Sequence, residues 1–123
     1  MARPSTVSRQ RAEKRGRRAE TIAAIYLRMK GYTILATRVR TPVGEIDLIA
    51  RRGNTVAFIE VKQRANLTLA QAAVPSRNWQ RTANAAASWM ARQSQFTDQN
   101  WRYDLIAIAP WKWPVHSADF WRP

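Results

Sequence analysis

Two segments of alternating apolar and polar residues dominate the pattern of the chain. They cover residues 43–50 and 56–62, and the stretch between them contains Gly53 and Asn54. Successive side chains of a strand point to opposite faces, so each segment predicts a β-strand. Gly and Asn between two such segments are typical of a tight turn. The pattern therefore predicts a β-hairpin.

Charged residues interrupt both strands of this hairpin. Asp47 shares a face of the first strand with Glu45 and Ile49, while Glu60 and Lys62 share a face of the second. The chain has only 8 acidic residues, and three of them lie here. Such charges usually form a solvated face with weak ion pairs. In strands this apolar, however, a partly buried carboxylate needs a partner or a metal ion, so the hairpin carries a candidate site.

The remaining pattern predicts helices and further strands around the hairpin. Residues 1–15 carry scattered Arg and Ser without apolar periodicity, so we expect a flexible basic arm there and a single domain over residues 16–123. We expect helices at 17–30 and 77–93, strands at 32–38 and 101–109, a loop or short helical turn at 67–74, and an edge strand with a packed tail within 111–123. This order predicts an α/β fold with a central mixed β-sheet flanked by helices.

The first expected helix carries an acidic residue with two interpretations. Ile22, Ile25 and Met29 follow a helical spacing, and Gly31 is typical of a helix end. Glu20 lies on a different side, among small and apolar neighbours. It is either a first-turn carboxylate favoured by the helix dipole or a third carboxylate that packs against the hairpin.

Tryptophan is concentrated in the second half of the chain. A stripe from Trp79 to Met90 on the second helix is more typical of a core than of a platform for base stacking. Four further aromatic residues follow the last long strand, and if exposed they would form a surface for a partner. They are Trp111, Trp113, Phe120 and Trp121.

Composition narrows the chemistry. The net charge of +13 makes nucleic acid the first partner to consider, an anionic membrane surface the second, and a basic protein kept soluble by its charge the third. The chain has no cysteine and only His116, so a metal site would depend on carboxylates, which favours Mg²⁺ or Mn²⁺. No apolar run reaches the length of about 20 residues that a membrane helix needs. We expect a cytoplasmic protein without a membrane partner.

Several short motifs occur together in a characteristic order. They are Gly16-Arg17-Arg18-Ala19-Glu20, then Leu27 with Gly31-Tyr32, then Gly44-Glu45-Ile46-Asp47-Leu48-Ile49, then Phe58-Ile59-Glu60-Val61-Lys62 with Arg64, then Arg102-Tyr103-Asp104. With these motifs the chain resembles the YraN family of small bacterial proteins. That family is similar to PD-(D/E)xK nucleases of the restriction-endonuclease-like fold, and it looks closest to Holliday-junction resolvases.

The resemblance implies a role for each residue of the candidate site. Asp47 and Glu60 would ligate Mg²⁺ or Mn²⁺ together with the backbone carbonyl of Val61, Glu20 would complete the acidic cluster, and Lys62 would act beside them in catalysis. Basic side chains would hold the phosphate backbone without sequence preference. We expect this of Arg38, Arg40, Arg64 and Arg81.

Three classes of function remain open from the sequence. The first is a metal-dependent endonuclease that hydrolyses phosphodiester bonds, with DNA favoured and branched DNA among the candidates. The second is a nucleic-acid-binding module that keeps the fold without catalysis. The third is an adaptor that binds a partner protein through its Trp-rich carboxyl terminus. Because junction resolvases act as dimers, a homodimer is also left open.

Overall fold

The computed structural model describes residues 6–73 and 76–123 as alternating helices and strands around one sheet. The order of the elements follows the expected one, with an added short 3₁₀ helix before the fourth strand. The elements are α1 Thr6–Met29, β1 Thr33–Thr41, β2 Gly44–Arg52, β3 Thr55–Gln63, α2 Leu67–Gln71, α3 Ser76–Met90, η1 Ser94–Phe96, β4 Asn100–Ile108 and β5 Val115–Trp121.

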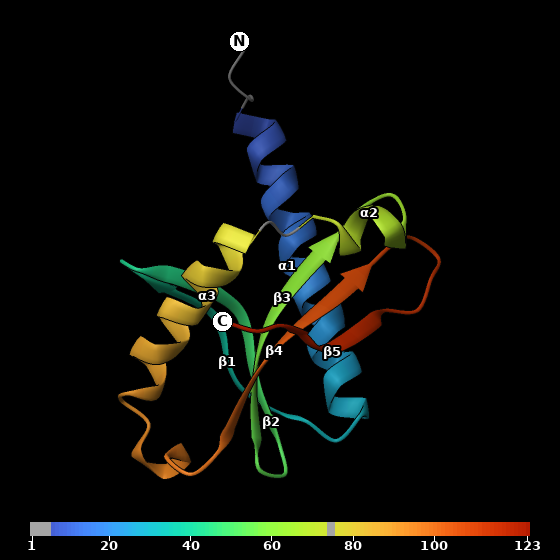
Figure 1. The fold of residues 1–123 in the computed structure, drawn as a ribbon. Helices are drawn as coiled ribbons and strands as arrows, with labels where there is room; N and C mark the ends of the chain where they lie inside the picture. Colours follow the sequence, from blue (N-terminus) through green and yellow to red (C-terminus); the bar gives the residue numbers. More distant parts are fainter. Residues whose placement is uncertain (1–5, 74–75) are drawn as a thin grey trace.

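The sheet is mixed and has the strand order β1-β2-β3-β4-β5. Its first three strands are antiparallel, β3 and β4 are parallel, and β5 returns antiparallel to β4 at the edge. Figure 1 shows α1 and α3 on opposite faces of this sheet, with α2 near the carboxyl end of β3. The predicted α/β class is therefore confirmed, with a central mixed sheet flanked by helices that is consistent with a restriction-endonuclease-like fold.

The predicted hairpin is present as β2 and β3. Arg52 pairs with Thr55, so Gly53 and Asn54 alone make the turn. Gly53 has a φ of +59°, a left-handed conformation that glycine adopts without steric cost. From Val56 to Val61 every residue of β3 is buried, because helices cover the strand on both faces.

Helix α1 begins earlier than we expected. It runs from Thr6, so residues 6–15 are helical rather than an irregular arm, and the first five residues of that expected arm lie outside the described part of the chain. This change also removes one interpretation of Glu20. Because Glu20 stands well inside the helix, a first-turn interaction with the helix dipole does not explain it.

Helix α1 ends just before Gly31, as predicted from the sequence. The N–H of Gly31 donates to the carbonyl of Arg28 at 3.0 Å, and the N–H of Tyr32 donates to that of Leu27 at 3.0 Å. Gly31 has a φ of +89°, and the side chains of Leu27 and Tyr32 belong to one core cluster. These features form a Schellman motif, which ends the helix and turns the chain into β1.

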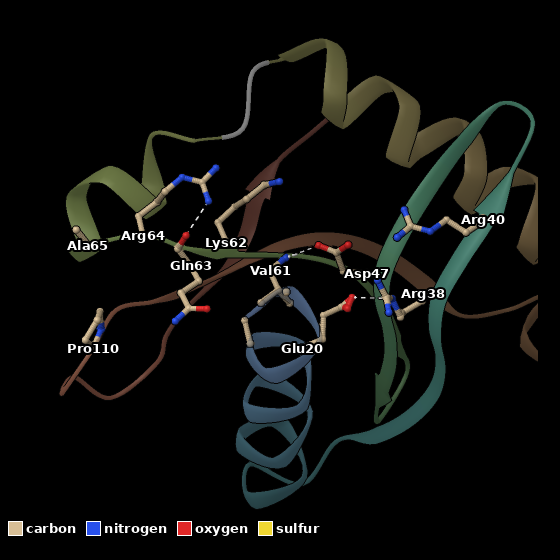
Figure 2. Close-up of a pocket in the computed structure, with 12 residues that line it drawn as sticks. Glu20, Arg38, Arg40, Asp47, Val61, Lys62, Gln63, Arg64, Ala65 and Pro110 are labelled. Atoms are coloured by element: carbon tan, nitrogen blue, oxygen red, sulfur yellow. Dashed lines mark hydrogen bonds and ion pairs between the residues drawn. The ribbon is translucent and has the colours of Figure 1, made fainter. Parts of the chain in front are cut away.

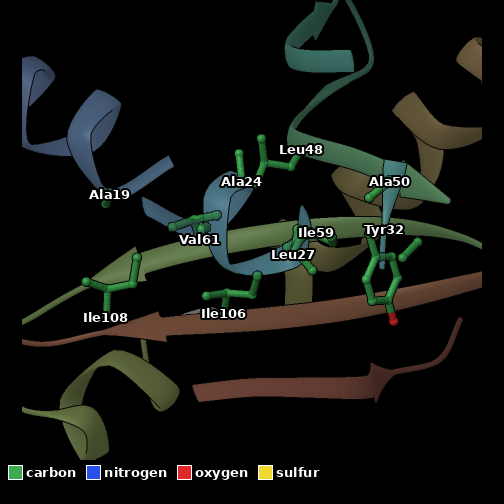
Figure 3. Packing of buried hydrophobic residues seen from close by; sticks show 12 residues of the cluster. Ala19, Ala24, Leu27, Tyr32, Leu48, Ala50, Ile59, Val61, Ile106 and Ile108 are labelled. Atoms are coloured by element: carbon green, nitrogen blue, oxygen red, sulfur yellow. The ribbon is translucent and has the colours of Figure 1, made fainter. Parts of the chain in front are cut away.

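The face of α1 that packs on the sheet consists mainly of small residues. Ala19, Ala23, Ala24 and Leu27 are buried there against β2, β3 and β4 (Figure 3). The larger apolar residues that indicated the helix lie on its other sides, and three of them are exposed, namely Ile22, Ile25 and Met29. Small side chains let the helix backbone approach the sheet closely, which brings Glu20 near the start of β2 and the end of β3.

Helix α3 covers the opposite face with the predicted Trp stripe. Trp79 is 2% exposed and belongs to a second core cluster with Phe58 and Leu105. The ring of Trp121 from β5 stacks on Trp79 with centroids 6.0 Å apart. The interpretation of Trp79 as a core residue is therefore confirmed, and the carboxyl-terminal strand forms part of the same core.

Candidate active site at the ends of strands β2 and β3

Strands β2 and β3 separate at Asp47, and this opening creates the site. Their pairing extends only as far as Leu48 and Ile59. Beyond that point the Asp47 carboxylate takes the role of a backbone acceptor on β2, since its Oδ2 accepts a hydrogen bond of 2.8 Å from the N–H of Val61. Arg38, which faces this position from β1, has a φ of +52°, an uncommon value for a residue other than glycine. The local break in the ladder holds Asp47 at the mouth of the opening.

Glu60 lies on the α3 side of the opening and is buried, with 7% of its surface exposed. Its Oε1 accepts a hydrogen bond of 2.9 Å from the hydroxyl of Thr82. Burial, reinforced by the nearby Asp47 carboxylate, raises the pKa of Glu60 to about 8 against the opposing effects of Thr82 and Lys62. The pKa of Asp47 is also raised by burial, although the Val61 N–H and Lys62 oppose the rise. Two carboxyl groups are thus held together where each disfavours the charge of the other.

Glu20 reaches the same opening from α1, as Figure 2 shows. Its Oε1 lies 3.4 Å from Nε of Arg38, and its Oε2 is buried without a hydrogen-bond partner. Burial and the Asp47 carboxylate raise its pKa, while Arg38 and Arg40 lower it. An unpaired buried carboxylate oxygen beside a second carboxylate is a position that a cation could satisfy.

Two cavities meet at Asp47 and Lys62, which line both. The larger, of about 740 Å³, is also lined by Glu20 and Val61, together with Gln63 and Pro110. The smaller, of about 110 Å³, lies between the hairpin and α3 and contains Glu60 and Thr82. The four arginines expected to contact phosphate line these two cavities. Arg38, Arg40 and Arg64 line the larger one, and Arg81 lines the smaller one.

Within the described part of the chain, two of these arginines already contact a carboxylate. Arg40 forms an ion pair with Glu45, and Arg38 contacts Glu20. Both side chains of the Arg40–Glu45 pair are exposed, so this pair costs little to open, whereas the Arg38–Glu20 pair holds a buried carboxylate. Arg64 donates from its guanidinium to the carbonyl of Gln63 at 2.7 Å. The rim of the larger cavity is therefore basic while its floor is acidic.

Thr82 and Asn78 of α3 line the smaller cavity, and neither was predicted from the sequence. Thr82 is 1% exposed, and its hydroxyl lies 3.1 Å from the carbonyl of Asn78 as well as 2.9 Å from Glu60. A signal for Thr82 was present, since it lies three residues after Trp79 on the apolar stripe. A polar residue on a buried stripe needs a partner, which here is Glu60.

The donor set suits a hard cation, but the structure does not place all three carboxylates in one ligand shell. No group of three or more Asp, Glu, His or Cys side chains in the described segments lies close enough to hold a single ion. Asp47 neighbours both Glu60 and Glu20. The arrangement fits an ion held by the carboxylates of Asp47 and Glu60 and by the backbone carbonyl of Val61. Glu20 would contact such an ion only through a water molecule.

These features describe a small α/β protein with a mixed sheet, whose second and third strands present two carboxylates and a lysine beside a basic cavity. A family model described as uncharacterised protein family UPF0102 matches residues 19–108. The chain belongs to this family, the YraN family that its motifs indicated.

Relatives match over nearly the whole chain. A UPF0102 protein of Mesorhizobium japonicum is 48% identical over 119 residues, covering 97% of this chain and 95% of its own length. One from Chelativorans is 50% identical over 121 residues, covering 98% of each chain. One from Bartonella henselae is 51% identical over 112 residues, covering 91% of this chain and 89% of its own.

Within residues 6–73 and 76–123, no helix combines the length and the apolar character needed to cross a membrane. The cytoplasmic location stays a prediction.

Proposed function

We propose that the protein is a metal-dependent nuclease that hydrolyses phosphodiester bonds of nucleic acid, with DNA favoured. One observation supports this most: Asp47, Glu60 and Lys62 converge where β2 and β3 separate, at cavities lined by Arg38, Arg40, Arg64 and Arg81. A likeness of fold alone would not support an activity, so the proposal depends on the chemistry of these side chains.

The basic rim would bind the phosphate backbone. Arg38, Arg40 and Arg64 surround the cavity into which the acidic residues face. Arginine donates several hydrogen bonds to a phosphate and keeps its charge at all relevant pH values. Contacts of this kind position a nucleic acid but carry no sequence information.

Mg²⁺ or Mn²⁺ would be held by Asp47, Glu60 and the carbonyl of Val61. The Val61 N–H points towards Asp47, and the N–H and C=O of one strand residue point to the same side, so its carbonyl faces the same opening. When bound, the ion would neutralise charge on the phosphate and lower the pKa of a coordinated water. A divalent charge would also favour the ionised forms of Asp47 and Glu60, whose pKa values burial raises.

Lys62 would act on the reacting groups themselves. Its ammonium group would orient the attacking water or stabilise the negative charge that develops on the phosphoryl oxygens. The water oxygen bonds to phosphorus as the bond to the leaving oxygen breaks, and the water proton passes to solvent. The leaving oxygen gains a proton, so the products are a phosphomonoester and an alcohol. Glu20 would position water beside the ion.

A cleavage assay tests this proposal. Labelled single-stranded, duplex, flapped and four-way-junction DNA, and RNA, are incubated with Mg²⁺, with Mn²⁺ and with chelator, using wild type, Asp47→Ala and Lys62→Ala. We expect metal-dependent cutting of at least one substrate by wild type, and a loss of at least 100-fold in both variants, because oriented electrostatic stabilisation of this kind contributes about that much.

Unfolding curves of each variant serve as the control for folding. Full cleavage by a well-folded Lys62→Ala protein would refute the assignment of Lys62. Binding that needs no metal, without cleavage of any substrate, would instead favour the binding module without catalysis.

A further inference from the structure

The loop between β4 and β5 presents two tryptophans to solvent. Trp111 is fully exposed and Trp113 is 75% exposed, whereas Trp79 and Trp121 pack in the core. Trp111 has a φ of +61°, a conformation that only a few per cent of residues other than glycine adopt. Burial of a Trp ring is a large source of stability, so two rings held out on one short loop call for a partner.

This loop adjoins the basic cavity. Pro110, the residue before Trp111, lines the larger cavity together with Arg64 and Lys62. The backbone N–H of Arg64 donates to the carbonyl of Ile108 at 3.1 Å, which ties the cavity rim to the end of β4. Figure 2 shows Pro110 at the end of the cavity opposite Arg40. A chain bound along the cavity from Arg40 would therefore leave it beside Trp111.

We propose that Trp111 and Trp113 stack on unpaired nucleobases of a strand whose phosphates occupy the basic cavity. This deepens the proposed function and depends on it, since it specifies the substrate as nucleic acid with a single-stranded segment next to the bound phosphates. Aromatic side chains stack on any base, but the base faces are accessible only in an unpaired strand. Flaps, open branches and single strands meet this requirement, whereas a continuous duplex does not.

Charge favours a nucleic acid over a second copy of the chain as the occupant. Lys112 lies between the two tryptophans in the sequence, and Arg64 lines the adjoining cavity. A second copy would bring another net charge of +13 to this surface. A polyanion instead complements the basic rim while its bases offer flat apolar faces to the rings.

The test compares binding of three labelled ligands by fluorescence anisotropy, in chelator so that none is cut. The ligands are a single-stranded oligonucleotide, the same strand with abasic sites throughout, and the matching duplex. The proteins are wild type, a Trp111→Ala/Trp113→Ala variant, and a Trp111→Phe/Trp113→Phe variant that keeps the rings. We expect the Ala variant to bind the single strand at least about 10-fold more weakly, with the abasic strand and the duplex unchanged. The Phe variant should retain most of the affinity.

The possible outcomes separate the two proposals. If wild type binds none of the ligands, the proposed function fails and this inference fails with it. If wild type binds but the Ala variant loses equal affinity for all three ligands, or none, stacking is refuted while the nuclease proposal stands. Sedimentation at equal concentrations provides a further check, because a change from dimer to monomer in the Ala variant would assign the rings to a contact between copies and overturn the inference.

Discussion

At the scale of single residues, the site is an interruption of the core. Glu60 occupies a position on β3 that its neighbours fill with apolar side chains, and it is held by the single hydroxyl of Thr82. Asp47 similarly takes the place of a backbone partner for Val61. Buried carboxylates with raised pKa values cost stability when ionised, and such costs are typical of functional positions.

The pH dependence of stability should report on Glu60. Its pKa is raised from 4.5 to about 8, so in this interval the folded protein binds more protons than the unfolded chain. The free energy of unfolding in chelator should therefore fall as pH rises from about 5 to about 8, by on the order of 1–3 kcal/mol. Glu60→Gln cannot ionise and should remove most of this fall, measured by urea unfolding at several pH values.

Asp98→Asn provides the matched control. Asp98 lies in the turn before β4 and lines neither of the two cavities described above. This variant should keep the pH dependence of wild type. A wild-type protein whose stability stays flat or rises over the same interval would show that Glu60 is ionised in the folded state.

At the scale of elements, the close approach of α3 to β2 aligns the two sides of the smaller cavity. A Cβ atom added to Gly44 would lie 1.9 Å from the carbonyl oxygen of Arg81, which is backbone and cannot rotate away. Glycine at this position lets α3 rest directly on the start of β2. The contact places Thr82 beside Glu60, so one small residue of β2 controls the geometry of a helix far from it in sequence.

Gly44→Ala should therefore displace α3. Because the clash is with backbone, we expect a loss of about 1–3 kcal/mol in the free energy of unfolding, measured by denaturant titration. Gly16→Ala is the control, since a Cβ there meets nothing within 4 Å and the position is helical. That control should raise stability by up to about 1 kcal/mol. Equal stability of the Gly44→Ala and wild-type proteins would show that α3 is not held at this distance.

The edge strand β5 is also anchored by a buried carboxylate, on the α1 side of the sheet. Asp104 accepts hydrogen bonds of 2.8 Å from Nε and Nη2 of Arg102, and its Oδ2 lies 2.7 Å from Nε2 of His116. Burial would raise its pKa, but these partners and the Asp119 N–H hold it below the ordinary value.

Deleting residues 111–123 would remove two of these partners, so substitutions of the exposed tryptophans are the better test of an adaptor function.

At the scale of the whole molecule, the charge is distributed to favour a polyanion. The acidic groups of the site lie within cavities, while arginines occupy the rims. A chain of net charge +13 attracts nucleic acid at long range, and the association weakens as salt screens it. The rims should then contribute to binding through the release of counterions.

The salt dependence of binding should identify these contacts. With duplex DNA in chelator, Arg64→Gln should weaken binding and reduce the slope of log K against log salt by up to about 1, as expected when one phosphate contact is lost. Arg92→Gln removes an equal charge from an exposed position in the turn after α3 that lines neither cavity. Fluorescence anisotropy measures both slopes. Equal slopes for the two variants would mean that net charge, rather than the cavity rim, governs binding.

Local patterns in the sequence were sufficient to predict the helices and strands and part of the candidate site. Alternation predicted the β2–β3 hairpin, and Gly31 predicted the end of α1, because strand faces and helix caps depend on neighbouring residues. The same alternation placed Glu60 and Lys62 on one strand face. The short motifs were specific enough to indicate the family from the sequence alone, and the family model confirms it.

Which surfaces of the elements meet follows from the folded structure and not from local patterns. The large apolar residues of α1 indicated the helix, yet the small residues beside Glu20 are the buried ones, because small side chains let the helix backbone lie close to the sheet. The start of α1 at Thr6, the bond from Thr82 to Glu60 and the exposure of Trp111 were equally hidden. The bond and the exposure depend on residues distant in sequence, and a local pattern carries no information about which distant group a side chain will meet.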